Sequence, residues 1–190
     1  FGLLIRFIVS KLTYKSEKIQ KNDLEHVFEI GANIGVRMPR VLSDGEFGAA
    51  KALLERAKNM GASFALVSNI GQTELVKSVG LSLFGSIGLN VYNSEAISKY
   101  KELGYEIITL SSELTQAQIR DLNKEGIRCA AFVKGRQELM VLESCIVRAN
   151  GKCKKQNDEP CTILRDRKGY EFPVFSEKRL GMDDFNCRCI

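Results

Sequence analysis

From about residue 34 onward, the chain alternates short apolar runs with amphipathic stretches. Each apolar run is hydrophobic at successive positions, which is typical of strands that are covered on both faces. The runs that we predict as strands are 36–41, 64–67, 81–84, 106–110 and 128–133. Because each strand is followed by a helical pattern, we expect βα units that form a parallel sheet with right-handed crossovers.

The predicted helices have recognisable starts and stops. Ser43 or Asp44 is expected to cap the helix that follows the first of these strands, and Asn93 begins another. The pair Ser111–Ser112 is expected to cap a helix that contains Leu114. Glycine is expected to end the helices at Gly61, Gly80, Gly104 and Gly126.

Two architectures fit these units, a (βα) barrel and an open doubly wound sheet. The units are short and uniform, and no G-x-G-x-x-G motif follows a strand, so we predict a partial TIM-like (βα) barrel. The units are too few to close eight strands, so the rest of a longer polypeptide or a partner would complete the barrel. The expected domains are an N-terminal strand and connector (1–33), a barrel portion (34–144) and an irregular cysteine-rich appendage (145–190).

Composition and charge permit an RNA partner without requiring one. The chain has 190 residues with 44% hydrophobic content and a net charge of +5, which suits a globular domain with a mildly basic surface. The apolar start at residues 1–10 is too short to span a membrane and lacks the pattern of a secretory signal. We therefore expect no membrane association, a cytoplasmic location and reduced thiols.

Five of the six cysteines lie within residues 145–190, the expected appendage. They contain no C-x-x-C motif, so neither a zinc ribbon nor a thioredoxin motif is indicated. Their spacing permits an iron–sulfur cluster, a zinc site made of thiolates, or structural and unpaired thiols. Cys129 lies apart from them in an apolar run and is expected to be a small core residue. The clustered cysteines are Cys145, Cys153, Cys161, Cys187 and Cys189.

Polar residues follow the predicted strands, at the end where (βα) barrels carry their active sites. The catalytic candidates are Glu113, Asn90 and Arg136, and the cofactor-binding candidates are Arg136 and Lys134. Arg136 could bind an acidic cofactor or an RNA phosphate. Each of these residues could instead be a helix cap or a loop residue. The same holds for Asn69 and for Asn93, which follow predicted strands as well.

The sequence gives little support for the catalytic mechanisms of standard proteases. The chain has one histidine, His26, which lies outside the repeated units and has no flanking catalytic motif. There is no H-E-x-x-H sequence for a zinc site. Hydrolysis through a histidine-activated nucleophile or a histidine-bound zinc is therefore disfavoured.

Several motifs over about residues 34–190 resemble those of the collagenase-like peptidase U32 family. They are MPR at 38–40, NIGQ at 69–72, GLNVYNS at 88–94, SSEL at 111–114, GRQELMV at 135–141, Cys145, GKC at 151–153, DRKG at 166–169, FPV at 172–174 and Cys187-Arg188. The match is to the C-terminal part of the long bacterial members. It implies a TIM-barrel-like fold.

The resemblance also implies a chemistry. Several family members are iron–sulfur proteins that install hydroxyl groups without molecular oxygen on RNA or a quinone precursor, with prephenate as an implicated donor. The long members resemble the ribosomal RNA 5-hydroxycytidine synthase group. The implied 4Fe-4S ligands are Cys145, Cys153, Cys161 and Cys187, with Cys189 spare. The alternatives are a collagenase-like peptidase and a non-catalytic binding module stapled by a metal such as zinc.

Overall fold

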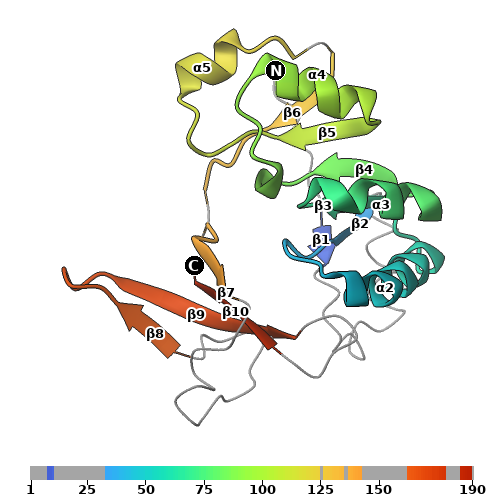
Figure 1. Ribbon diagram of the computed structural model, residues 1–190. Coiled ribbons are helices and arrows are strands. Elements are labelled where there is room, and N and C mark those ends of the chain that lie inside the picture. Colours follow the sequence, from blue (N-terminus) through green and yellow to red (C-terminus); the bar gives the residue numbers. More distant parts are fainter. Residues whose placement is uncertain are drawn as a thin grey trace. The chain divides into compact units, whose positions relative to one another are not determined.

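The computed structural model describes residues 8–10, 33–124, 126–134, 137–142, 162–178 and 185–189. By its internal contacts the chain divides into two compact units, Phe1–Val133 and Lys134–Ile190. Figure 1 labels the elements of both units. Each unit has a sheet of its own, so we describe them separately.

The first unit has a six-stranded sheet in which the strands follow one another in chain order. All five neighbouring pairs are parallel. This sequential order is the order of a (βα) barrel, whereas a doubly wound sheet reverses direction part-way. The α/β class with parallel strands is therefore confirmed, and it is consistent with a partial barrel. The strands are β1 (Ile8–Ser10), β2 (Ile34–Arg37), β3 (Phe64–Val67), β4 (Ser82–Gly85), β5 (Tyr105–Thr109) and β6 (Arg128–Ala130).

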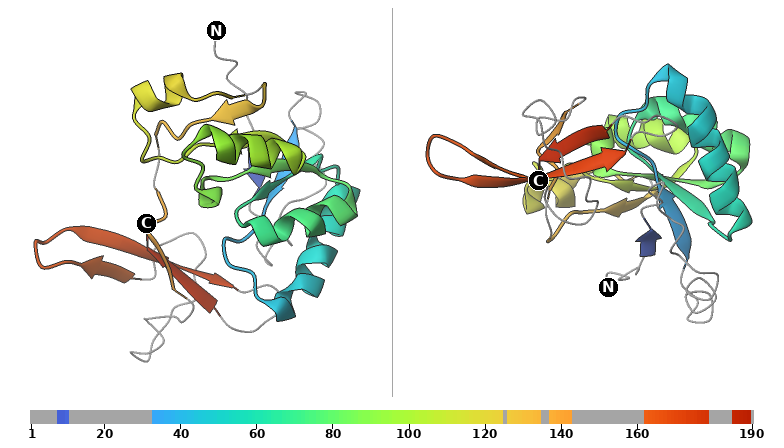
Figure 2. Two further views of the ribbon diagram at one scale, coloured as in Figure 1. Left: turned by 45° about the horizontal axis from the view of Figure 1, so that its top comes forward. Right: turned by 90° about the horizontal axis from the view of Figure 1, so that it is seen from below.

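Helices connect the strands and lie along one side of this sheet, as α2, α3 and α4 show in all the views of Figures 1 and 2. Their buried side chains include Leu54 in α2, Val76 in α3 and Ile97 in α4. Among the side chains of α5, none is buried. The helices are α2 (Phe47–Asn59), α3 (Thr73–Val79), α4 (Ser94–Glu102) and α5 (Gln116–Asp121), and the 3-10 turns are η2 (Asp44–Glu46), η3 (Ile70–Gln72) and η4 (Ile87–Leu89).

The two faces of the sheet bury different residues. We define the inner face as the face that carries a cluster of strand residues only, namely Phe64, Phe84 and Ile107 with Leu66 and Ala130 beside them. The rings of Phe64 and Phe84 stack with their centroids 4.2 Å apart and their planes 18° apart. Because side chains alternate along a strand, the residues between them belong to the helix-covered face.

Helix ends follow the sequence prediction at Gly61, Gly80 and Gly104, and depart from it at Gly126, because α5 already ends at Asp121 with Leu122 as its C-cap. Gly61, Gly80, Gly104 and Gly126 all have positive φ angles, which glycine adopts without steric cost. Of the two expected caps it is Ser43 that forms the N-cap, within a capping box in which the Glu46 side chain accepts from the Ser43 N–H.

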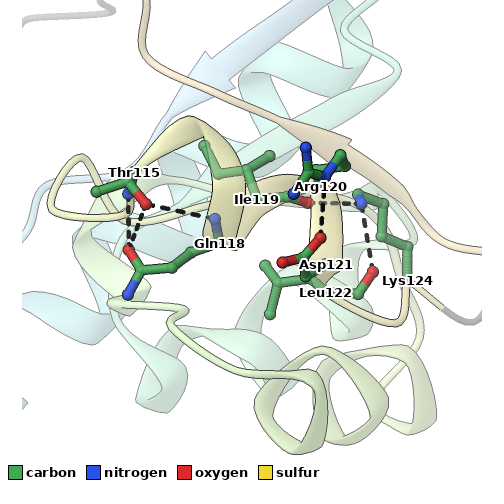
Figure 3. Close-up of polar contacts among 7 residues, drawn as sticks. All are labelled: Thr115, Gln118, Ile119, Arg120, Asp121, Leu122 and Lys124. Atoms are coloured by element: carbon green, nitrogen blue, oxygen red, sulfur yellow. Dashed lines mark hydrogen bonds and ion pairs between the residues drawn. The ribbon is translucent and has the colours of Figure 1, made fainter.

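The expected cap at Ser111–Ser112 was wrong, because the N-cap of α5 is Thr115. The Thr115 hydroxyl accepts from the Gln118 N–H, and the Gln118 amide oxygen accepts from the Thr115 N–H, which satisfies both free donors (Figure 3). At the other end of α5, the Lys124 ammonium donates to the carbonyl oxygens of Ile119 and Leu122.

Two strands are shorter than the sequence pattern suggests. The strand expected at 36–41 is β2, which begins at Ile34 and ends at Arg37. Pro39 has no N–H to continue the ladder, and the last contribution is the Met38 N–H, which donates to Leu66 O at 3.0 Å. The strand expected at 128–133 ends at Ala130, and Val133 is 92% exposed.

The second unit contains a four-stranded sheet with the order β7-β10-β9-β8, in which every neighbouring pair is antiparallel. The described part of the appendage is therefore regular, and the expectation of an irregular module was wrong there. Side chains alternate between the two sides of strand β9, as in any strand. Val174 is fully buried, whereas Glu171 on the opposite side is exposed. The strands are β7 (Met140–Leu142), β8 (Thr162–Arg165), β9 (Glu171–Lys178) and β10 (Phe185–Cys189).

The boundary between the units falls between Val133 and Lys134, earlier than the division after residue 144 that the sequence suggested. Strand β7 belongs to the second unit because it pairs with β10, at Leu142 opposite Cys187. The β8–β9 hairpin turns at Asp166, whose carboxylate accepts from the N–H groups of Lys168 and Tyr170, both at 2.8 Å. This local bonding explains why the DRKG motif forms a tight turn.

Candidate functional site at the carboxyl edge of the parallel sheet

The loops after β2 and β3 are joined by the side chain of Gln72. Its Nε2 donates to Pro39 O at 2.6 Å, and its Oε1 accepts from the Ser68 N–H at 3.2 Å. Gln72 is only 1% exposed, so these bonds are made away from water. The amide therefore holds the carboxyl ends of two neighbouring strands in a fixed arrangement.

The loops after β3 and β4 lie in close contact. A methyl group at Gly88 would lie 2.7 Å from Ser68 O, which is too close for any side chain. The Ser86 N–H donates to Val67 O at 2.8 Å and extends the parallel ladder by one step. The absence of a side chain at Gly88 is thus what allows the β4 loop to approach the end of β3.

The loops after β4 and β5 are joined by main-chain bonds. Val91 forms an isolated parallel bridge with Leu110, and the Ser111 N–H donates to Val91 O at 2.9 Å. Asn90 directly precedes this bridge, and the Glu113 N–H donates to Ser111 Oγ at 3.3 Å. The structure therefore brings two of the catalytic candidates, Asn90 and Glu113, onto adjoining loops of one edge.

The side chains of these two candidates are open to solvent. Asn90 is exposed and adopts the left-handed region with φ 51°, which asparagine tolerates better than most residues. Glu113 is exposed in the turn that precedes α5, so it is not part of the first turn of that helix. A carboxylate and an amide on adjoining loops can hydrogen-bond a ligand at the edge and, for the carboxylate, transfer a proton.

Two other asparagines of this edge are occupied as caps. The Asn69 side chain accepts from the Gly71 N–H at 2.9 Å, and the Asn93 side chain accepts from the Ala96 N–H at 2.8 Å. The capping interpretation is therefore confirmed for both residues.

The two basic candidates are not assigned to this edge. Lys134 is exposed and is the first residue of the second unit, beyond the end of β6. The expectation that it directly follows a strand end was wrong, because β6 stops at Ala130. Arg136 lies outside the described residues.

Sequence reasoning missed the buried polar residues of this edge. Ser68, Ser86 and Ser111 are 3%, 7% and 5% exposed, respectively. A signal for them exists, because each is among the first polar residues after a buried strand in three consecutive βα units. Their recurrence after three consecutive buried strands would have separated them from ordinary loop serines.

Of the four proposed cluster ligands, only Cys187 lies within the described residues. It occupies β10, where its main chain is opposite Leu142 and Ser176. Cys189 lies in the same strand, opposite Met140 and Val174. Residues two apart in a strand lie on the same face of the sheet. The backbone therefore gives no reason to prefer Cys187 over Cys189 as a possible ligand. The other three proposed ligands, Cys145, Cys153 and Cys161, lie outside the described residues.

Cys129 in β6 is half-buried, less enclosed than the core residue expected from sequence. Burial raises the pKa of its thiol, and the charge of Lys124 lowers it to a smaller extent. Because the thiolate is the reactive form, Cys129 is not an activated nucleophile.

Within the described ranges, no group of three or more His, Cys, Asp or Glu side chains is placed to hold a metal ion. The same part of the chain contains no helix of the length and apolar character that a membrane crossing requires. The buried polar side chains that follow β3, β4 and β5 are the hydroxyls of Ser68, Thr73, Ser86 and Ser111 and the amide of Gln72.

The sequence matches peptidase family U32 over residues 11–184, which is most of the chain. The chain belongs to peptidase family U32. A solved structure described as "The Structure of the U32 Peptidase Mk0906" is similar to this U32 chain with 15% identity and a TM-score of 0.48. The match covers 68% of this chain and 56% of that one, so the U32 chain spans little more than half of the solved protein. No curated protein matches it significantly.

Proposed function

We propose that this U32 chain is part of an iron–sulfur enzyme that hydroxylates RNA bases without molecular oxygen. The observation that carries the proposal is the chemistry of the carboxyl edge. The buried polar side chains that follow β3, β4 and β5 are hydroxyls and an amide, and Glu113 adds an exposed carboxylate, which suits binding and proton transfer better than hydrolysis. The motif resemblance implies this chemistry, and the match over residues 11–184 shows the U32 family alone.

A peptidase is the alternative that the family's description favours. Peptide hydrolysis needs an activated nucleophile or a metal-bound water. The hydroxyls of Ser68 and Ser111 are engaged with main-chain groups, Met38 O at 3.4 Å and the Glu113 N–H at 3.3 Å. No described side chain forms a nucleophile–base pair with them, so the geometry supports hydrolysis less well.

Each candidate residue has a role in the proposal. Glu113 would transfer the proton that leaves the base, and Asn90 would hydrogen-bond the substrate beside it. Lys134 and Arg136 would bind the carboxylates of prephenate or an RNA phosphate. Hydroxylation replaces a C–H bond by a C–OH bond and removes two electrons from the base. The proposal therefore requires prephenate as the source of the hydroxyl group and an external electron acceptor that would receive the two electrons through the cluster.

The proposed cluster ligands are the four thiolates Cys145, Cys153, Cys161 and Cys187. Cys187 lies in the interior of the second unit's sheet, in a strand paired on both sides. A paired strand gives a ligand a fixed backbone position. When bound, an iron–sulfur cluster would supply electron transfer for the oxidation.

The test is the iron and sulfide content and the absorption spectrum of anaerobically prepared protein. We expect about four irons and four sulfides per chain, lost in Cys187→Ala and retained in the control Cys129→Ala. Mass spectrometry of RNA from cells that lack the protein would then show a missing hydroxylated base. One zinc per chain without iron would instead indicate the non-catalytic stapled module. Peptide hydrolysis that is lost in Glu113→Gln would establish the peptidase.

A further inference from the structure

Ser86 is a buried serine whose hydroxyl bonds none of the residues that the structure describes. Ser86 is 7% exposed, and its main-chain N–H donates to Val67 O. Its side chain makes no capping bond to η4 and has no hydrogen bond within the residues that the structure describes. Buried polar groups almost always have a partner, so an unmatched hydroxyl indicates a strained position or a ligand.

The position of Ser86 directs its side chain to the inner face of the sheet. Ser86 has an extended backbone, with φ −82° and ψ 166°, so the alternation of β4 continues through it. It therefore lies on the same face as Phe84, two residues earlier, which belongs to the inner cluster. The inner face at the carboxyl ends of strands is where a (βα) barrel binds its ligand.

Ser86 belongs to a row of small neutral residues. Val67 pairs with Gly85, and Gly85 pairs with Ile108, so one step further along the ladder Ser86 lies between Ser68 and Thr109. Thr109 in turn pairs with Ala130. No member of this row is charged.

The other two hydroxyls in the row are satisfied by main-chain oxygens. Ser68 Oγ donates to Met38 O at 3.4 Å, and Thr109 Oγ1 donates to Gly85 O at 2.8 Å. In the part of the chain described, Ser86 alone of the three has a hydroxyl proton that is not donated. Arg37, which lies on the inner face of β2, is already engaged in another interaction.

The chemistry of this position is that of binding. A serine nucleophile needs a base in hydrogen-bond contact, and the Ser86 hydroxyl has no such contact among the described residues. A single neutral hydroxyl in an uncharged row suits an uncharged polar group, because a phosphate or carboxylate would lose its solvation without a compensating cation.

We propose that Ser86 is a ligand-contacting residue that hydrogen-bonds an uncharged polar group of the substrate. This assignment rests on the function proposed above: the uncharged group is the edge of an RNA base, and the RNA phosphates are bound elsewhere. The stacked Phe84 and Phe64 rings lie on the same face, nearer the amino ends of the strands, so the neighbours of Ser86 on that side are apolar.

The test uses cytidine and uridine as probes, titrated into the full chain, the Ser86→Ala variant and the control Ser82→Ala. Ser82 lies in the same strand and on the same face, at its amino-terminal end. We expect binding to weaken about three- to tenfold in Ser86→Ala, the effect of one neutral hydrogen bond, and to stay unchanged in the control. The melting temperature of Ser86→Ala should be no lower than that of the wild type, since no protein hydrogen bond is lost.

Three outcomes would overturn the proposal. A lower melting temperature with unchanged nucleoside binding would make Ser86 a structural residue. No binding of either nucleoside to the wild type would refute the base assignment, and Ser86-dependent binding of an uncharged N-acetyl dipeptide amide would assign the position to a peptide. The iron content is measured separately, so failure of the cluster proposal is distinguishable from failure at Ser86.

Discussion

Gln72 illustrates how one residue organises the candidate site. Its amide bonds both the β2 loop and the β3 loop, through Pro39 O and the Ser68 N–H. A buried amide of this kind is stable only when both of its polar ends are satisfied. The local sequence NIGQ contains no sign of this, because Pro39 is distant along the chain.

We expect Gln72→Leu to lower the free energy of unfolding by about 2–3 kcal/mol, because it leaves a buried N–H and a buried carbonyl without partners. Denaturant unfolding followed by circular dichroism measures the change. The control is Gln116→Leu at the exposed start of α5, which should change the free energy by less than about 0.5 kcal/mol. Equal effects of the two substitutions would show that the Gln72 bonds do not contribute to stability.

At the scale of elements, two glycines show how the same change has opposite effects in a strand and a helix. A methyl group at Gly35 in β2 would lie 2.1 Å from the ring of Phe64, which is stacked on Phe84. At Gly48 in α2 nothing lies within 4 Å. The strand glycine is therefore needed for packing, whereas the helix glycine is not.

We expect Gly35→Ala to destabilise the protein by about 1–3 kcal/mol, because the Phe64 ring must move out of its packed position. Gly48→Ala should stabilise it by about 0.4–1 kcal/mol by restricting the unfolded chain. Thermal and denaturant melts of the two variants measure both effects. A destabilised Gly48→Ala, or an unaffected Gly35→Ala, would contradict the packing described here.

At the scale of the whole molecule, the phenols of Tyr100 and Tyr105 make the free energy of unfolding depend on pH in the alkaline range. Tyr105 is 3% exposed, and its hydroxyl is 2.9 Å from Thr73 Oγ1, while its ring meets Tyr100 edge-on. Burial raises the pKa of Tyr105 above its usual value of 10.0, opposed by the Thr73 hydrogen bond and reinforced by Tyr100. Burial also raises the pKa of Tyr100.

The sign of the resulting effect follows from proton linkage. Above about pH 10 the unfolded chain releases these phenolic protons while the folded protein keeps them, so the free energy of unfolding falls as the pH rises. Denaturant melts at pH 8 and pH 11 should show a smaller fall in the Tyr100→Phe/Tyr105→Phe double variant. The exposed Tyr92→Phe serves as the control, and an equally reduced fall in that variant would refute the assignment to the buried pair.

Much of the first unit was determined by the sequence itself. The two-sided apolar runs, the glycine stops and the Ser43 capping box are local signals, and local signals survive folding because they depend on neighbours a few residues away. The family was indicated by motifs, such as DRKG, and the match over residues 11–184 confirms it. The thiol ligand set and the RNA substrate stay predictions.

Only the tertiary structure decided the contents of the candidate site. Ser68, Ser86 and Thr109 become neighbours through the register of three strands, and register is set by packing between distant segments. The same reason explains the strands of the second unit, where β7 belongs to the sheet only through its pairing with β10. In the first unit the sequence determined which elements form, and contacts between distant residues determined which side chains meet.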